Sequence, residues 1–399
     1  MRLAEFPGAI AVLCLAAALA AECAAQQTPG LAAQKQSALA LEQEGKIAEA
    51  EAAWRSFSSG HPNDWEAYAH LGLLEARQQH YGEAIALDRK ALSLNPKMPN
   101  LRVNLGLSQF KGGDLRGAIQ TFAPLLRSTP PSSPMALRLT TLTGLAHYGL
   151  GEYAASVPYL KTAAAADPGN LELRMTLAHS CLWSKQYQCV LDTYHQILAL
   201  NAESAEADML AGEAYDELNN SAGALEEFQA AVKADPKQPN VHFGYGYLLW
   251  KALKFRDAEA EFKAELAQNP ENPLALAYLG DSEMRLNQTD AAMPHLEQAV
   301  RIQPAIPIAH LDLGILYEGR GRKQDALREL KAAERLEPGD PLVHWNLGRY
   351  YRSTGQMEEA RGEFEKTRTL QNRKNDSLRE KMNQIEAAPA GESTRAPAK

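Results

Sequence analysis

The chain has 399 residues, of which 45% are hydrophobic and 23% are charged, and its formal net charge at pH 7 is −8. This acidic balance argues against nucleic acid as the main partner, because neutralising phosphates requires clustered lysine and arginine. The length suffices for two or three compact domains or for one long array of repeats.

The first 25 residues have the order of a secretory signal peptide. Arg2 precedes an apolar segment at residues 8–21, and Cys23-Ala24-Ala25 resembles a cleavage site before Gln26. We therefore expect residues 1–25 to be removed and residues 26–30 to be a linker. The mature chain is then an exported protein of the periplasm or the extracellular space.

A lipid anchor on Cys23 is the alternative that we favour less. Glu22 directly precedes this cysteine, at the position where lipoprotein signals have a small residue. After the signal peptide, no apolar run approaches the roughly 18–20 residues that span a bilayer, so we expect no transmembrane segment.

Prolines divide the body of the chain into segments of 34 residues. The marks are Pro62, Pro96 and Pro130, then Pro168, Ala202 in place of a proline, Pro236, Pro270, Pro304 and Pro338. Only the step from 130 to 168 is longer, by four residues, and it contains the proline-rich stretch 129–134. A Leu-Gly pair recurs in the same register at 71–72, 105–106, 279–280, 313–314 and 347–348.

This pattern resembles the tetratricopeptide repeat family, in which W-x2-L-G-x2-Y is followed by A-x3-F and by proline. Ala118 with Phe122 and Ala258 with Phe262 fit the second part. The resemblance covers residues 31–374 and implies an all-α fold, a right-handed α-solenoid of about ten helix-turn-helix repeats. Repeats 1–3 with the insertion occupy residues 31–136, and repeats 4–10 occupy residues 137–374.

The segments after the repeats differ in composition. Residues 375–386 are polar and predict a capping helix, whereas residues 387–399 are too polar and proline-rich to pack and predict a disordered tail. We expect the insertion at 129–136 to be the one place where the stack kinks or flexes.

The decapeptide VHFGYGYLLW falls in the first helix of the seventh repeat. On a helix that advances 100° per residue, Phe243, Tyr247 and Trp250 share one narrow stripe. Gly246 belongs to a second stripe, which carries the repeat signature and should face the core. The first stripe occupies positions that line the concave groove and bind ligands in the family. Gly244 fits neither pattern.

The same positions of the other repeats extend this groove. The candidate partner-binding residues are Phe110, Tyr148, Met175, Trp183, Met209, Glu213, Asp216, Glu217, Phe243, Tyr247, Trp250, Arg285, Trp345 and Arg349, with Asp281 also on the groove wall. Apolar anchors beside an acidic middle favour a basic or amphipathic peptide. Core packing between neighbouring repeats is the alternative for about half of the aromatic residues.

No phosphate-binding, zinc-protease or serine-hydrolase motif is present in the sequence, so we expect no enzyme, no cofactor and no metal. His179, Cys181, Cys189 and His195 fit no zinc pattern, because they would lie on different faces of two helices. The two cysteines flank one helix-turn-helix, where a disulfide and two small buried side chains are both open alternatives.

His242, His310 and His344 share the fourth repeat position. A pH switch is one interpretation. Because we expect no carboxylate to recur beside all three, we interpret them instead as partly buried rings at a helix contact.

The sequence thus predicts a non-enzymatic scaffold for cell-envelope or secretion assembly, which binds a peptide or protein segment in a concave groove. The alternative is an adaptor subunit of an exported enzyme complex for polysaccharide synthesis, export or modification. Neither the partner nor the oligomeric state follows from the sequence.

Overall fold

The computed structural model describes residues 30–201 and 203–387. The expected signal peptide, the linker up to residue 29 and the expected tail from residue 388 onward lie outside the described residues. Within the described residues every regular element is an α-helix, and the twenty helices form ten helix-turn-helix repeats. The all-α fold class is therefore confirmed.

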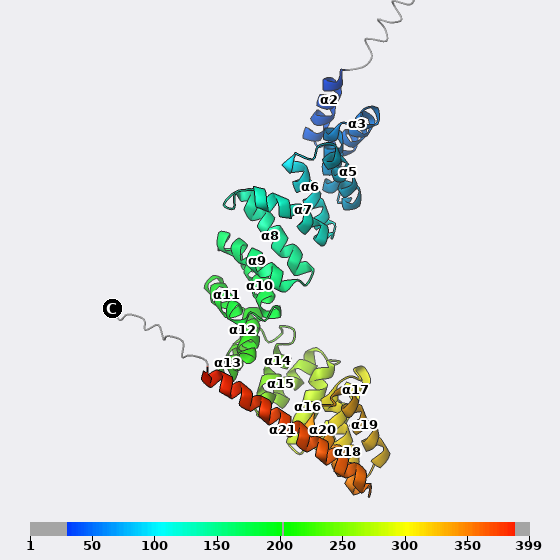
Figure 1. The fold of residues 1–399 in the computed structure, drawn as a ribbon, viewed down its shortest axis with the longest axis vertical. Coiled ribbons are helices and arrows are strands. Elements are labelled where there is room, and N and C mark those ends of the chain that lie inside the picture. Colours follow the sequence, from blue (N-terminus) through cyan, green and yellow to red (C-terminus); the bar gives the residue numbers. More distant parts are fainter. Residues whose placement is uncertain (1–29, 202, 388–399) are drawn as a thin grey trace, which may run out of the picture. The chain divides into compact units, whose positions relative to one another are not determined.

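The helices divide into two compact units, Met1–Gln186 and Tyr187–Lys399. In the first unit each helix packs against the next one in the sequence (Figure 1). Its helices are α2 Leu31–Gln43, α3 Ile47–Gly60, α4 Trp65–Arg77, α5 Tyr81–Leu94, α6 Pro99–Lys111, α7 Leu115–Ser128, α8 Pro134–Gly149, α9 Tyr153–Ala166 and α10 Leu171–Trp183.

In the second unit the first helices of successive repeats also contact one another, so that α14, α16, α18 and α20 lie side by side. The helices of this unit are α11 Tyr187–Leu200, α12 Ala205–Glu217, α13 Ser221–Ala234, α14 Val241–Lys251, α15 Phe255–Gln268, α16 Pro273–Arg285, α17 Thr289–Ile302, α18 Pro307–Gly319, α19 Lys323–Leu336, α20 Pro341–Ser353 and α21 Met357–Ala387. These four neighbouring first helices build the face on which the candidate site lies.

One turn geometry separates the two helices of every repeat. The fifteenth residue of each of the ten repeats has a positive φ, between 59° and 83°. These residues are Gly45, Gln79, Gly113, Gly151, Lys185, Asn219, Leu253, Asn287, Gly321 and Gly355. A residue in the left-handed region ends the first helix and turns the chain back. In half of the repeats the residue with positive φ is not a glycine.

The small residue at the eighth repeat position allows the two helices of a repeat to approach closely. A Cβ atom at Gly246 would lie 2.9 Å from the Phe262 ring, and one at Gly348 would lie 2.6 Å from the Phe364 ring. The second stripe of the decapeptide 241–250 therefore does face the core, as expected.

Most of the four inserted residues belong to the start of α8. α8 begins at Pro134, three residues before the position at which the repeat register would start it. Ser133 caps this helix by accepting a hydrogen bond from the Ala136 amide at 3.1 Å. The division between the two units falls at residues 186–187 and not at this insertion.

The expected capping helix is not a separate element. Residues 375–386 continue α21, which runs without a break for 31 residues from Met357. No proline or glycine separates residues 364–386, so the second helix of the tenth repeat has no sequence signal that would end it.

The expectation that no carboxylate recurs beside the three histidines was wrong. His242, His310 and His344 each place Nδ1 within 2.6–2.7 Å of a glutamate oxygen, and each glutamate lies nineteen residues later in the chain. These glutamates are Glu261, Glu329 and Glu363. The partner lies on the second helix of the same repeat, so it is distant in the sequence and adjacent in space.

Candidate functional site

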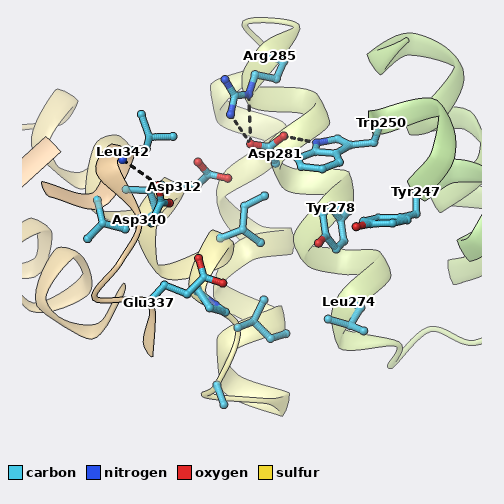
Figure 2. A pocket seen from close by; sticks show the side chains of 16 residues that line it. Tyr247, Trp250, Leu274, Tyr278, Asp281, Arg285, Asp312, Glu337, Asp340 and Leu342 are labelled. Carbon is cyan, nitrogen blue, oxygen red and sulfur yellow. Dashed lines mark hydrogen bonds and ion pairs between the residues drawn. The ribbon is translucent and has the colours of Figure 1, made fainter. Parts of the chain in front are cut away.

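A pocket of about 380 Å³ opens on the first helices of repeats 7–10 (Figure 2). Tyr247 and Trp250 of α14 form one side, and Asp281 and Arg285 of α16 extend from them. Asp312 of α18 and the segments before α18 and α20 complete the lining. The contacts between neighbouring first helices thus bring residues from four repeats together.

Trp250 is held by a buried carboxylate. Its indole Nε1 donates a hydrogen bond to Asp281 Oδ2 at 2.5 Å. The other oxygen, Oδ1, accepts from Arg285 Nε at 3.2 Å and from Nη2 at 3.1 Å (Figure 2). Asp281 is 1% exposed, so a buried carboxylate holds the side chains of Trp250 and Arg285 in place.

Asp312 lies beside Asp281, and one of its two carboxyl oxygens has no partner in the protein. It is only 3% exposed, and its Oδ2 atom has no hydrogen-bond partner. Desolvation and then the neighbouring Asp281 carboxylate raise the pKa of Asp312 well above its usual range, and the Arg285 cation opposes them. Asp312 therefore keeps its proton at a pH where an isolated carboxyl group is ionised.

Aromatic rings line the pocket next to these carboxyl groups. The Tyr278 ring packs edge-on against Trp250 with centroids 4.9 Å apart, and against Tyr247 at 5.3 Å. Desolvation, Tyr247, Asp281 and Glu337 together raise the pKa of Tyr278 to about 12, so its hydroxyl group stays neutral. The site therefore combines an aromatic wall with polar groups at its base.

The charge of the lining is unbalanced. Asp281, Asp312, Glu337 and Asp340 provide four carboxyl groups, and Arg285 provides the single basic side chain of the lining. A pocket with this composition favours a cationic group on its ligand.

Three of the sequence-predicted residues, Tyr247, Trp250 and Arg285, line this pocket, and Asp281 of the expected groove wall joins them. Phe243 does not line it: its ring is partly buried and packs against Phe262 with centroids 6.1 Å apart. Trp345 is 45% exposed and does not line this pocket. It lies on an adjoining pocket, which shares Asp340 and Leu342 with the first and includes Gln371 and Lys374 of α21. Arg349 is exposed and lines neither of these pockets.

The predicted acidic residues of α12 lie nearer the start of the second unit. Glu213 is exposed at the surface of α12. Asp216 is neutralised by Lys251, whose Nζ lies 2.6 Å from Oδ1. Met209 is partly buried and packs against two core clusters.

In the first unit, the predicted residues separate into a surface cluster and core residues. Trp183 is 49% exposed, and its ring lies 6.0 Å from Tyr148 and 4.6 Å from Tyr153, which the groove positions did not include. Phe110 packs against the core, and Met175 is partly buried. The structure thus places the exposed aromatic surface of this unit around Trp183.

Cys181 and Cys189 are both disulfide-bonded. Neither sulfur is then a thiolate that could act as a zinc ligand. That the two sulfurs are joined to one another is our proposal, and it follows from their positions on either side of one turn.

Within the described residues, one trio has the ligand types and spacing of a metal site, namely Glu334, His344 and Glu363. Both nitrogens of His344 are already occupied, Nδ1 by Glu363 and Nε2 by the Pro338 carbonyl at 2.9 Å. Lys331 and Lys366 pair with the glutamates. These contacts define an ion-pair cluster, because each candidate ligand already has a partner of the protein.

The fold defines a class of protein: a helical repeat protein, whose first helices build the pocket described above. The tetratricopeptide repeat family profile matches residues 36–99, 103–170, 191–239, 245–307 and 311–372, and the chain belongs to this family. Domains of this family bind protein or peptide partners and are typically non-enzymatic scaffolds.

Individual relatives are distant. The BBSome complex member BBS4 of Bos taurus is 23% identical over 51% of this chain, and the match covers 38% of its own length. The CTR9 homologue of Arabidopsis thaliana is 22% identical over 68% of this chain and 26% of its own length. The chain therefore spans well under half of these curated relatives.

A solved tetratricopeptide repeat protein from Parabacteroides merdae is 17% identical and covers 63% of this chain and 98% of its own, with a TM-score of 0.47. In the described part of the chain, no helix combines the length and the apolar character that crossing a membrane requires.

Proposed function

We propose that the chain is a non-enzymatic scaffold that binds a segment of a partner protein in the pocket around Trp250. The observation that carries this proposal is the pocket itself: an aromatic wall next to the buried Asp312, whose Oδ2 atom has no hydrogen-bond partner. A core gains nothing from an unsatisfied buried carboxyl group, so its presence in an open pocket favours a ligand that satisfies it.

The bound segment lies across the first helices of repeats 7–10 and carries apolar side chains as well as positive charge. Leu274 and Leu342 are exposed and belong to the lining, and they offer apolar contacts on both sides of the polar base. Aromatic and apolar anchors with a few fixed polar groups are the arrangement by which peptide-binding pockets achieve affinity and orientation.

The proposed setting is outside the cytoplasm, in assembly of the cell envelope or of a secretion system. This part rests on residues 1–25 alone, and it is tested by the N-terminal sequence of the mature chain and by cell fractionation. An intact N-terminus on a cytoplasmic chain would overturn it.

Site-specific photocrosslinking tests the location of the binding site. A benzoylphenylalanine at Leu274 or Leu342 should crosslink the partner in cells. The same probe at Ile302 should not, because Ile302 is 39% exposed in the same unit but does not line the pocket. Equal crosslinking from position 302, or none from 274 and 342, would contradict the proposal. Crosslinks to glycan and not to protein would favour the polysaccharide adaptor.

A further inference from the structure

We propose that the pocket selects an arginine of the bound segment, whose guanidinium group pairs with the Asp312 carboxylate. This inference rests on the proposed function, since it names the chemistry that the same site recognises. Three observations support the inference: the position of Asp312, the charge of the residues that line the pocket, and the aromatic rings of the pocket.

Asp312 provides the acceptor. Its Oδ2 atom is buried and has no partner. The one cation of the lining, Arg285, donates from both Nε and Nη2 to Asp281 Oδ1 and makes no hydrogen bond to Asp312 Oδ2. A buried carboxyl oxygen without a hydrogen bond costs free energy, and a donor from a ligand removes that cost.

The surrounding charges favour a cation over a neutral donor. Asp281 and Asp312 at the base, with Glu337 and Asp340 from the α19–α20 loop, face a single Arg285. In a partly desolvated pocket, one added positive charge interacts with all four carboxyl groups more strongly than it does in water.

The aromatic wall favours guanidinium over ammonium. Tyr247, Trp250 and Tyr278 present their rings to the same pocket (Figure 2). A guanidinium group is planar, stacks on aromatic faces and is less strongly hydrated than an ammonium group, so it enters such a site at a smaller desolvation cost. We expect a lysine to bind less tightly at this position.

Binding is then coupled to proton release. In the free protein, desolvation and Asp281 raise the pKa of Asp312, and Arg285 lowers it. The other titratable groups facing this centre are Tyr247 of α14, Tyr278 of α16, and Glu337 and Asp340. A bound guanidinium acts in the same direction as Arg285, so Asp312 loses its proton as the arginine enters, and affinity rises with pH.

Three nonapeptide libraries test the selection. Their central residue is fixed as arginine, lysine or citrulline, and the flanking residues are randomised among small and apolar types. We expect wild-type protein to retain the arginine library at least ten-fold more strongly than the citrulline library, with lysine between them. Asp312→Asn keeps the size of the side chain but removes its charge, and it should abolish most of this difference.

Calorimetry in two buffers of different ionisation enthalpy provides a second measurement on unaltered protein. Binding of a retained arginine peptide should release protons to the buffer, and binding of its citrulline counterpart should release none. Equal retention of arginine and citrulline libraries by wild-type protein would overturn the arginine selection but leave peptide binding intact. Failure of all three libraries to bind would overturn the proposed function as well. Arginine preference that survives in correctly folded Asp312→Asn would show that another group recognises the cation.

Discussion

At the scale of single residues, the chain contains side chains that are understood only through a neighbour in another repeat. Gly244 is the clearest case, because it fits neither stripe of its helix. A Cβ atom there would overlap the Phe228 ring, which belongs to the preceding repeat and is 3% exposed. The glycine therefore permits close packing between repeats 6 and 7, beside the close packing within repeat 7 that Gly246 permits.

Replacing this glycine should destabilise the second unit. Alanine normally stabilises a helix interior by about 1 kcal/mol relative to glycine, but Gly244→Ala should lower stability by roughly 1–3 kcal/mol through overpacking. Chemical denaturation followed by circular dichroism measures this. Gly319→Ala is the control, because nothing lies within 4 Å of a Cβ atom there. An unchanged or raised midpoint for Gly244→Ala would show that Phe228 moves away without cost.

Leu253 is the reverse case: it is a leucine at a position whose backbone conformation favours glycine. It has a φ of 59°, and it is 72% exposed, so it adds strain and little burial. Leu253→Gly should stabilise the second unit by about 0.5–1 kcal/mol, since relief of the left-handed strain exceeds the added chain entropy.

The shift of the denaturation midpoint checks this expectation. Gly321 occupies the equivalent position with a φ of 76°, so Gly321→Leu should shift the midpoint in the opposite direction. A destabilised Leu253→Gly variant would mean that the leucine makes contacts that outweigh its backbone strain.

At the scale of helices, the histidine–glutamate pairs join the two helices of a repeat. His310 donates from Nδ1 to Glu329 at 2.7 Å and from Nε2 to the Pro304 carbonyl at 3.0 Å. Two acceptors require two protons on the ring, which is the cationic form. The Glu329 hydrogen bond is the largest influence that raises the pKa of His310, and the Pro304 carbonyl adds to it against desolvation.

This pairing makes stability depend on pH in a defined direction. Since the folded-state pKa of His310 is raised above about 6.5, its contribution is fully present below that value and is lost as the pH rises through the folded-state pKa. Glu329→Gln should therefore destabilise the protein by roughly 1–2 kcal/mol at pH 6, and by less at pH 9.

Thermal unfolding of both proteins across this pH range gives the comparison. Glu358→Gln is the matched control, because Glu358 is exposed and pairs with an arginine, Arg361, and not with a histidine. A difference between wild type and Glu329→Gln that stays constant from pH 6 to pH 9 would exclude a cationic His310.

At the scale of the whole molecule, the repeat architecture could be predicted and the chemistry of the pocket only in part. The 34-residue register of proline and Leu-Gly located the repeats, and the family positions placed Tyr247, Trp250 and Arg285 in the groove. Asp312 could not be found in this way, because it occupies the sixth position of its repeat, outside the groove positions considered. Glu337 and Asp340 lie between helices, where the repeat pattern assigns no role.

Some of what was missed was visible in the sequence. A glutamate nineteen residues after each of His242, His310 and His344 is a fixed spacing that a search across the two helices of a repeat would detect. The partial burial of some groove candidates could not be predicted from the sequence. Phe110, Met209 and Phe243 share repeat positions with groove residues, but they pack against the core. Helical periodicity gives the direction of a side chain but not the shape of its surroundings.

The most direct test of the central claim uses the five tryptophans of the chain as position markers. Peptides selected from a random library on the purified mature chain are added to ¹⁵N-labelled protein, and the indole N–H signals are assigned by single Trp→Phe variants. Because the Trp250 indole donates to Asp281 at the base of the pocket, its signal should shift on binding, while that of the 1%-exposed Trp54 should not. Selected peptides that shift the signals of Trp183 or Trp345 and leave that of Trp250 unchanged would contradict the account.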